Sequence, residues 1–267
     1  ANGIGLEVVQ RCHAHGANVV IADLPNARIS AEAAIQSLGG ASQALFVPVN
    51  IVVWEEVRDL FSTTIKRFGK VDIVVANAGI METRKFFDFE VDQNGELKDD
   101  GSGMVIDVNL KGTMNSEFIK VRFSPISRAY VSQAFKFAVF HMKNNSPNKS
   151  GWRGSVTLVS STSGYIGGTE VISYVSSKHG IIGLLRSSHG PAANLGVRVN
   201  GVAPFITPTH ITKCYSAAWE AEGFPVNTPA DVAAAIVHMS LDSGVSGRCC
   251  LVILPDLKLM FNSIDMG

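Results

Sequence analysis

The stretch that decides the fold runs from Gly3 to Asp23 and reads GIGLEVVQRCHAHGANVVIAD. Apolar residues recur at helical spacing from Ile4 to Cys12, and Gly16 is placed to end that helix. The apolar run from Asn18 to Asp23 that follows is typical of a strand. The stretch therefore predicts a helix followed directly by a strand.

The same alternation continues along the chain. The predicted elements are a helix over Ala31 to Leu38, a strand over Ala44 to Val49, a helix over Glu55 to Phe68, a buried strand over Val71 to Ala76, a helical region near Asp107, a strand over Ser155 to Ser160, helices over Ile172 to Leu195 and Ala230 to Leu241, and strands over Val197 to Val202 and Cys249 to Leu254. Polar turn formers predict exposed loops at 92–103 and 144–154. This pattern predicts an α/β fold with a mainly parallel sheet covered by helices on both faces, in one domain over residues 1–267.

Composition excludes several classes of partner. The formal net charge is zero and no cluster of Lys and Arg is dense, so we expect no nucleic-acid partner. No apolar stretch is long enough for a membrane span, and no signal-peptide pattern is present, so we expect no membrane partner and a cytoplasmic location. The cysteines and histidines lack metal-site spacing, so we expect reduced thiols and no metal.

The segment Tyr174-Val175-Ser176-Ser177-Lys178 carries the first chemical signal. Its tyrosine and lysine are about one helical turn apart and so share a helix face. An ammonium beside a phenol favours the phenolate. Ser161 closes the strand that is predicted just before this helix. Tyr174 is therefore a candidate for proton exchange with an alcohol or a carbonyl.

A second signal lies at the start of the chain. Gly3-Ile4-Gly5 opens the first helix, where free N–H groups and the helix dipole can hold a pyrophosphate. Asp23 ends the next strand, where an acid can accept hydrogen bonds from an adenosine ribose. Neither Asn2 nor Leu24 is basic, and the carboxylate would repel a 2′-phosphate, so the pattern favours NAD over NADP.

Taken together, these features resemble the short-chain dehydrogenase/reductase family over nearly the full length of the chain. The matching segments are Ala1-Asn2-Gly3-Ile4-Gly5, Asp23, Ala76-Asn77-Ala78-Gly79, Asn109 in Val108-Asn109-Leu110-Lys111-Gly112, Ser161, Tyr174 with Lys178, and Arg198-Val199-Asn200-Gly201-Val202-Ala203-Pro204. The segment 203–209, APFITPT, is most similar to that of fungal members. The resemblance implies a doubly wound, Rossmann-like parallel sheet.

The resemblance also implies an NAD(P)-dependent oxidoreductase that moves a hydride between a nicotinamide and a secondary alcohol or ketone. Tyr174 would be the acid/base, and Lys178 would favour its phenolate and hold the nicotinamide ribose. Ser161 would stabilise charge on the substrate oxygen. Asn109 would hold the water through which Lys178 exchanges protons with solvent.

The implied cofactor residues follow the same motifs. They are Gly3, Ile4 and Gly5 at the pyrophosphate, Asp23 and Leu24 at the adenosine ribose, Asn50 and Ile51 at the adenine, Asn77, Ala78 and Gly79 along the cleft, Tyr174 and Lys178 at the nicotinamide ribose, and Ile206 and Thr207 at the nicotinamide amide. Asn50 stands where the family often has Asp. Phe205 stands where the family has Gly, and it either walls the substrate pocket or packs in the core.

Two departures from the family pattern affect the expected architecture. The chain starts inside the glycine motif, so we expect it to be N-terminally truncated and the family's first strand to be missing. A loop or insertion about residues 113–128, centred on Asn115 to Arg128, includes Ser124-Pro125, which would break a helix. That helix carries the homodimer or homotetramer contact in the family, so the insertion bears on assembly.

The substrate loop is expected about residues 204–228. Its Ile206, Ile211, Tyr215, Trp219 and Phe224 favour an apolar secondary alcohol or ketone. Two alternatives stay open: a catalytically inactive relative that keeps the fold as a binding module, and a non-functional fragment. The intact set of Asn109, Ser161, Tyr174 and Lys178 favours an enzyme, because a binding module has no physical need for it.

Overall fold

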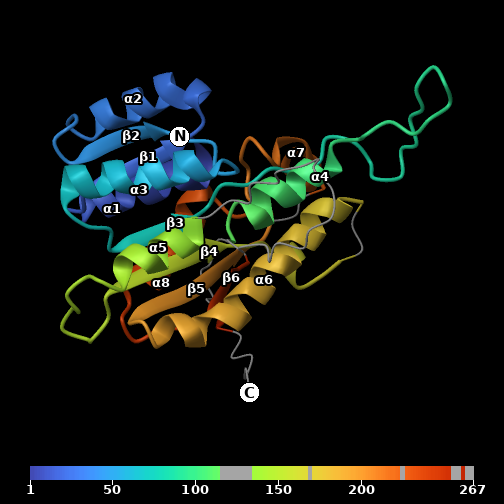
Figure 1. Cartoon of the computed structure of the whole chain (residues 1–267). Helices are drawn as coiled ribbons and strands as arrows, with labels where there is room; N and C mark the ends of the chain where they lie inside the picture. Colours follow the sequence, from blue (N-terminus) through green and yellow to red (C-terminus); the bar gives the residue numbers. More distant parts are fainter. Residues whose placement is uncertain (115–133, 168–169, 223–225, 254–259, 262–267) are drawn as a thin grey trace, which may run out of the picture.

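Helices and strands alternate through the computed structural model, which describes residues 1–114, 134–167, 170–222, 226–253 and 260–261 (Figure 1). The helices are α1 (Gly3–Ala14), α2 (Arg28–Ser37), α3 (Trp54–Phe68), α4 (Ser102–Ile106), α5 (Ala134–Met142), α6 (Ile172–Ala193), α7 (Lys213–Ala221) and α8 (Pro229–Leu241), with short helical turns η1 (Pro25–Ala27), η2 (Asp107–Lys111) and η3 (Thr162–Gly164). The strands are β1 (Val19–Asp23), β2 (Ala44–Pro48), β3 (Ile73–Ala76), β4 (Gly154–Val159), β5 (Val197–Pro204), β6 (Cys249–Val252) and β7 (Met260–Phe261).

The strands form two sheets. In one, β1 pairs with β2 in parallel; in the other, the order is β3-β4-β5-β6-β7. The pairs from β3 to β6 are parallel, and only the last pair, β6 with β7, is antiparallel. Helices α5 and α6 pack on one face of the larger sheet and α8 packs on the other (Figure 1). The predicted doubly wound, Rossmann-like α/β fold is therefore confirmed.

The division into two sheets leaves β1 and β3 each with one strand partner among the described residues. The prediction of a buried strand at 71–76 is wrong for β3, because all four of its residues are only partly buried. A strand that is paired along one edge only is not enclosed as a central strand is.

The core lies on both faces of the larger sheet. One apolar cluster packs α5 and α6 against β4 and β5, and a second packs α1 and α8 against the opposite face. Helix α8 begins with a capping box: Thr228 Oγ1 accepts from the Asp231 N–H at 3.2 Å, and Asp231 Oδ2 accepts from the Thr228 N–H at 2.9 Å. The sequence Thr-Pro-Ala-Asp thus fixes the start of this helix.

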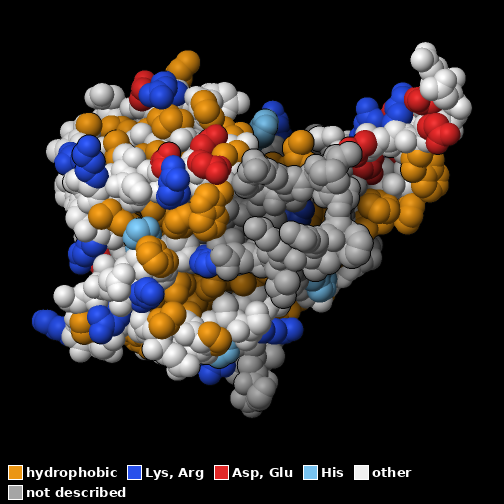
Figure 2. Space-filling model, in the orientation of Figure 1, with side chains coloured by type: hydrophobic (Ala, Val, Ile, Leu, Met, Phe, Trp, Pro, Cys, Tyr) orange, Lys and Arg blue, Asp and Glu red, His pale blue; other side chains and the backbone are white. Residues whose placement is uncertain are grey.

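A projecting arm extends from the body between β3 and α4 (Figure 1). It carries exposed apolar side chains next to charged ones, and Val91 and Leu97 form an antiparallel bridge within it (Figure 2). The predicted exposed loops at 92–103 and 144–154 match the structure, although α4 begins within the first and β4 at the end of the second. The predicted insertion at 113–128 falls almost wholly outside the described residues, and Phe224 also lies outside them.

Candidate active site

The candidate site gathers at the carboxyl ends of the parallel strands. Asp23 ends β1, Asn77 follows β3, Ser161 follows β4, and Phe205 follows β5. Strands that run in parallel present these ends on one edge of the sheet, where open α/β sheets bind their ligands. Asn77, Ser161 and Phe205 therefore share one edge of the larger sheet, and Asp23 lies at the carboxyl end of a strand in the smaller sheet.

Tyr174 and Lys178 lie in the first two turns of α6, on one helix face as their spacing predicts. The Lys178 ammonium lies 5.5 Å from the centroid of the Tyr174 ring. Lys178 is 5% exposed, and its Nζ donates to the Val159 carbonyl oxygen at 3.0 Å. Burial lowers the pKa of Lys178 to about 8, because a low-dielectric surrounding disfavours its charge. At neutral pH this lysine is still mainly protonated.

Ser161 reaches the same point from the end of β4. Its hydroxyl hydrogen-bonds the Tyr174 side chain, donates to the Pro204 carbonyl oxygen at 3.4 Å, and accepts from the Ser163 N–H at 3.2 Å, which caps η3. The structure thus brings the hydroxyl and the phenol together from two elements. Their contact is what a pair acting on one substrate oxygen requires.

The pKa of Tyr174 is raised. Burial is the largest cause, the hydrogen bond between the Tyr174 and Ser161 side chains acts in the opposite direction, and the charge of Glu82 adds to the effect of burial. The causes of this shift do not include Lys178, and its role in favouring the phenolate stays a prediction. Tyr174 is therefore a protonated phenol at neutral pH.

Asn109 lies in the π-helical turn η2 and is 1% exposed. Its side-chain oxygen accepts from the Ile80 N–H at 2.7 Å, and its amide nitrogen donates to the Ile80 carbonyl at 2.8 Å and to Ser177 Oγ at 3.0 Å. The side chain thus joins the segment after β3 to α6. Its backbone carbonyl accepts from Thr113 Oγ1 at 2.9 Å, and the predicted water-holding role stays a prediction.

The glycines of the candidate cofactor cleft lie where an added Cβ would be in tight contact with neighbouring side chains. A Cβ at Gly5 would lie 3.1 Å from Asn77 Nδ2, and a Cβ at Gly79 would lie 3.2 Å from Asn109 Oδ1 and 3.7 Å from Lys178 Nζ. Gly3 has a φ of +51°, which favours glycine. The α1 N-terminus has no side-chain cap and no acid in its first turn, so its N–H groups suit an anion. These residues fit a dinucleotide pyrophosphate.

The adenosine end of the cleft is less enclosed. Asp23 is 35% exposed in its side chain, its Oδ1 accepts from the Leu24 N–H at 2.8 Å, and its Oδ2 contacts the Ala1 ammonium. Asn50 follows β2, and its side-chain oxygen accepts from the Val52 N–H at 3.2 Å, so it holds the turn that also contains Ile51. The side-chain oxygen of Asn50 is thus already engaged.

The segment after β5 covers the other end of the cleft. Thr207 is buried and donates through Oγ1 to the Phe205 carbonyl at 2.9 Å, and the Ile206 carbonyl accepts from the Asn227 N–H at 2.9 Å. The Phe205 ring packs edge-on against Trp219 with centroids 5.5 Å apart. The two interpretations of Phe205 are therefore compatible, since its ring packs on α7 within the predicted substrate loop.

Sequence reasoning missed one residue of this site. Glu82 reaches the backbone N–H groups of Ser173 and Tyr174 from the segment after β3. No local pattern indicated this contact, because its partners are 91 and 92 positions away. The glutamate following Asn77-Ala78-Gly79 was the available signal, but a single acid in a polar segment is typical of a solvated surface.

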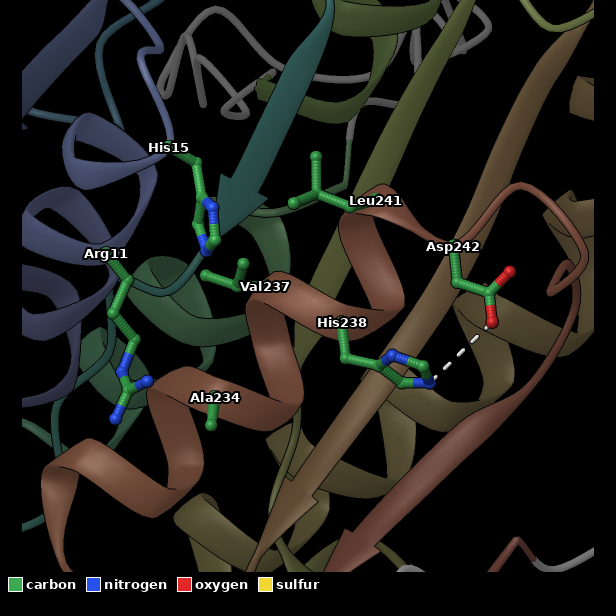
Figure 3. Close-up of a pocket in the computed structure, with 7 residues that line it drawn as sticks. All are labelled: Arg11, His15, Ala234, Val237, His238, Leu241 and Asp242. Atoms are coloured by element: carbon green, nitrogen blue, oxygen red, sulfur yellow. Dashed lines mark ion pairs between the residues drawn. The ribbon is translucent and has the colours of Figure 1, made fainter.

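Other features of the described residues point elsewhere. A pocket of about 460 Å³ lies between α1 and α8 and contains none of the predicted site residues; its lining consists of Arg11, His15, Ala234, Val237, His238, Leu241 and Asp242 (Figure 3). Cys12, Cys249 and Cys250 are free, and burial raises the pKa of Cys249 to about 11, so it is a neutral thiol at physiological pH. No helix in the described ranges is long and apolar enough to cross a membrane.

Comparison with known proteins identifies the class that this fold and site define. Residues 1–118 and 128–219 match the family model for short chain dehydrogenases, and the chain belongs to that family. Short-chain dehydrogenase reductase 5 of Arabidopsis thaliana is 31% identical over 79% of this chain and 69% of its own length. Short-chain dehydrogenase/reductase prx4 of Penicillium roqueforti is 32% identical over 90% of this chain and 63% of its own length. The chain thus spans about two thirds of these relatives.

A solved structure gives the same result. The 3-hydroxyacyl-CoA dehydrogenase type-2 from Mycobacterium avium superposes with a TM-score of 0.75 at 26% identity, covering 94% of this chain and 90% of that one. The predicted family is therefore confirmed. The unmatched residues 119–127 in the family comparison lie in the segment for which an insertion is predicted, and that insertion stays a prediction.

Proposed function

We propose that this chain is an NAD-dependent oxidoreductase that moves a hydride between a nicotinamide and a secondary alcohol or ketone. One observation carries the proposal: Ser161, Tyr174 and Lys178 meet at the carboxyl edge of the sheet, beside the glycine Gly79. Asn109 stabilises the same part of the site through its hydrogen bonds to Ile80 and Ser177. Three separate parts of the chain supply these groups: α6 supplies the phenol and the ammonium, the segment after β4 supplies the hydroxyl, and η2 supplies the buried amide.

The protonation states support the direction of carbonyl reduction. A bound nicotinamide would supply the hydride to the carbonyl carbon. Tyr174, whose pKa is raised, gives its proton to the carbonyl oxygen. Ser161 Oγ donates a hydrogen bond to the same oxygen and stabilises its developing charge. In alcohol oxidation the proton moves back to Tyr174, which must first reach its phenolate form.

Lys178 and Asn109 support these two residues. The Lys178 ammonium, mainly protonated at neutral pH, is placed to hold the nicotinamide ribose and to favour the phenolate once Tyr174 has given up its proton. Asn109 fixes Ile80 and Ser177 by three hydrogen bonds and thereby holds the floor of the site. A water on its backbone carbonyl would connect Lys178 to solvent.

The proposed cofactor is NAD, with NADP the weaker ligand. The α1 N-terminus, with Gly3, Ile4 and Gly5, would hold the pyrophosphate, and the Asp23 carboxylate would accept from the ribose hydroxyls. A 2′-phosphate would meet this carboxylate. The next basic residue, Arg28, is engaged with Glu32 at 3.3 Å and lies over the Phe46 ring. The other proposed contacts are Leu24, Asn50, Ile51, Asn77, Ala78, Gly79, Ile206 and Thr207.

The proposed substrate is apolar. The segment at 204–228 presents the Phe205 and Trp219 pair together with the exposed side chains of Ile211 and Tyr215. These side chains suit a hydrocarbon group on either side of the carbonyl.

Assembly as a homodimer or homotetramer is also part of the proposal. An insertion in the segment at 113–128 would disturb this assembly.

The test is a fluorescence titration of the chain with NADH and NADPH in parallel, followed by turnover assays with apolar secondary alcohols and ketones. We expect saturable binding, tighter for NADH, and NADH-dependent reduction of at least one ketone. NADH binding without turnover of any substrate would favour the inactive binding module. Binding of neither cofactor would contradict the proposal and favour the fragment.

A further inference from the structure

Helix α6, which carries Tyr174 and Lys178, begins without a cap of its own. The first N–H groups of any helix have no partner inside the helix. Here Val171 occupies the N-cap position and offers no side-chain acceptor, and the first turn contains no acidic residue. The residues of this helix therefore offer no side-chain acceptor to the N–H groups at its N-terminus.

Glu82, from the segment after β3, supplies acceptors for two of these N–H groups. Its Oε1 accepts from the Ser173 N–H at 2.8 Å, and its Oε2 accepts from the Tyr174 N–H at 3.1 Å. A carboxylate bound to two N–H groups at a helix N-terminus is a strong, charge-assisted contact. One of these two N–H groups belongs to the candidate acid/base itself.

A second contact holds the same segment to the same helix. Asn109 binds both backbone groups of Ile80 and donates to Ser177 Oγ. Glu82 therefore contacts the start of the Tyr174-to-Lys178 turn directly, and Asn109 links Ile80 to Ser177 within that turn. Gly79, which precedes this segment, lies beside Lys178 and the proposed cofactor cleft.

We infer that Glu82 is a positioning residue: it fixes the first turn of α6 against the β3 end of the site and so sets where the Tyr174 phenol stands relative to Gly79. The inference rests on the proposed function for its catalytic consequence. It does not depend on that function for its structural content, because the two hydrogen bonds exist whatever the chain catalyses.

The charge of Glu82 has a second consequence. The groups that act on the Tyr174 phenol are the Glu82 carboxylate and the Ser161 hydroxyl, from separate segments, and Lys178 on its own helix. The carboxylate raises the pKa of Tyr174, in the same direction as burial. It therefore favours the protonated phenol that carbonyl reduction needs.

A neighbouring ion pair provides a matched control. Lys85 Nζ lies 2.8 Å from Glu170 Oε2, and both side chains are well exposed. The pair joins the base of the arm to the segment before α6, but no described contact connects it to a helix N–H. Glu170→Gln therefore removes a carboxylate close in sequence to α6 without touching its first turn.

The experiment compares Glu82→Gln, Glu82→Ala and Glu170→Gln. Glu82→Gln keeps an acceptor oxygen but loses the charge, so we expect kcat for ketone reduction within about threefold of wild type and a pH profile shifted to lower pH. Glu82→Ala loses both acceptors, so we expect kcat to fall about 10- to 100-fold while NADH affinity is kept, since small misplacements of a reacting group have effects of this size. Glu170→Gln should match wild type.

Amide hydrogen exchange at Ser173 and Tyr174 gives a readout that needs no turnover. Exchange at both amides should be faster in Glu82→Ala, less so in Glu82→Gln, and unchanged in Glu170→Gln. If the wild type turns over no substrate but this exchange pattern appears, the proposed function fails and the positioning contact stands. Unchanged exchange in Glu82→Ala, or wild-type kcat with an unshifted pH profile in both Glu82 variants, would overturn the inference.

Discussion

The two sheets hold opposite ends of the proposed site and differ in how completely they are enclosed. All eight residues of β5 are buried, and five of six in β4, whereas β1 has two buried residues of five. The catalytic candidates sit on the enclosed side, where Lys178 is 5% exposed. Asp23, on the smaller sheet, has a side chain that is 35% exposed.

This difference in enclosure determines how strongly each charged group interacts with the charges around it. Charges interact more strongly, and pay a larger desolvation cost, where water is excluded. On the enclosed side, burial shifts the pKa values of both Tyr174 and Lys178. On the open side, water screens a carboxylate such as Asp23. Substitutions in the larger sheet should therefore have large effects on chemistry, and those in the smaller sheet modest effects on cofactor choice.

The largest expected effect tests the enclosed side. Tyr174→Phe removes the phenolic proton and little else, so kcat should fall by about 10²- to 10⁴-fold, the usual size of a general acid/base contribution. The Kd for NADH, from fluorescence titration, should stay within a factor of two or so because the ring remains. Steady-state assays of ketone reduction measure kcat.

Tyr165→Phe is the matched control for that substitution. Tyr165 hydrogen-bonds Cys249 and packs against the core, and no described contact joins its hydroxyl to Tyr174 or Lys178. Its loss should leave kcat near the wild-type value. Full activity in Tyr174→Phe would remove the acid/base assignment, and with it the contrast between the two sheets.

Much of this architecture could be predicted from the sequence, because it depends on local periodicity. The helix at Ile172–Ala193 was predicted to end at Leu195 and the strand at Val197–Pro204 to end at Val202, so both differ from the structure only at their ends. The one-turn separation of Tyr174 and Lys178 needs only the helical repeat. Ser161 was placed correctly because a strand end is marked by a change from apolar to polar residues.

The rest depends on partners that are distant in the chain. Glu82 caps a helix 91 residues away, and no periodicity encodes such a contact. The partial burial of β3 depends on which strands flank it, and the apolar sequence Ile73–Ala76 is the same with one neighbour or with two. The π-helical turn around Asn109 likewise has no sequence pattern of its own.

The second prediction concerns the cost of enclosing Lys178. Its pKa is about 8 in the folded chain against 10.5 ordinarily, so the unfolded state binds more protons between these values. Stability should therefore rise with pH across this window, and below pH 8 the buried charge should cost about 3 kcal/mol. Urea unfolding of wild type and of Lys178→Met, at several pH values from 7 to about 10.5, isolates the contribution of Lys178 to the free energy of unfolding.

The informative quantity is the difference in the free energy of unfolding between wild type and Lys178→Met, because all other titrating groups are common to both proteins. The free energy of unfolding of wild type minus that of Lys178→Met should increase by about 3 kcal/mol over the window. A constant difference would mean that Lys178 is solvated, and the larger sheet would then not enclose its site as the structure indicates.

The smallest expected effect tests the open side. Asp23→Ala should raise the Kd for NADH about tenfold, the equivalent of one hydrogen bond to a charged group, and leave the Kd for NADPH unchanged or lower. Because Asp23 is far from the proton-transfer groups along the cleft, kcat at saturating NADH should stay near wild type. Parallel fluorescence titrations with NADH and NADPH measure the ratio of the two Kd values.

Glu32→Ala is the control. It removes an exposed carboxylate on α2 that pairs with Arg28, and it should change neither the Kd for NADH nor the Kd for NADPH. An equal loss of both cofactors in Asp23→Ala would assign this carboxylate to the stability of the smaller sheet and not to the ribose.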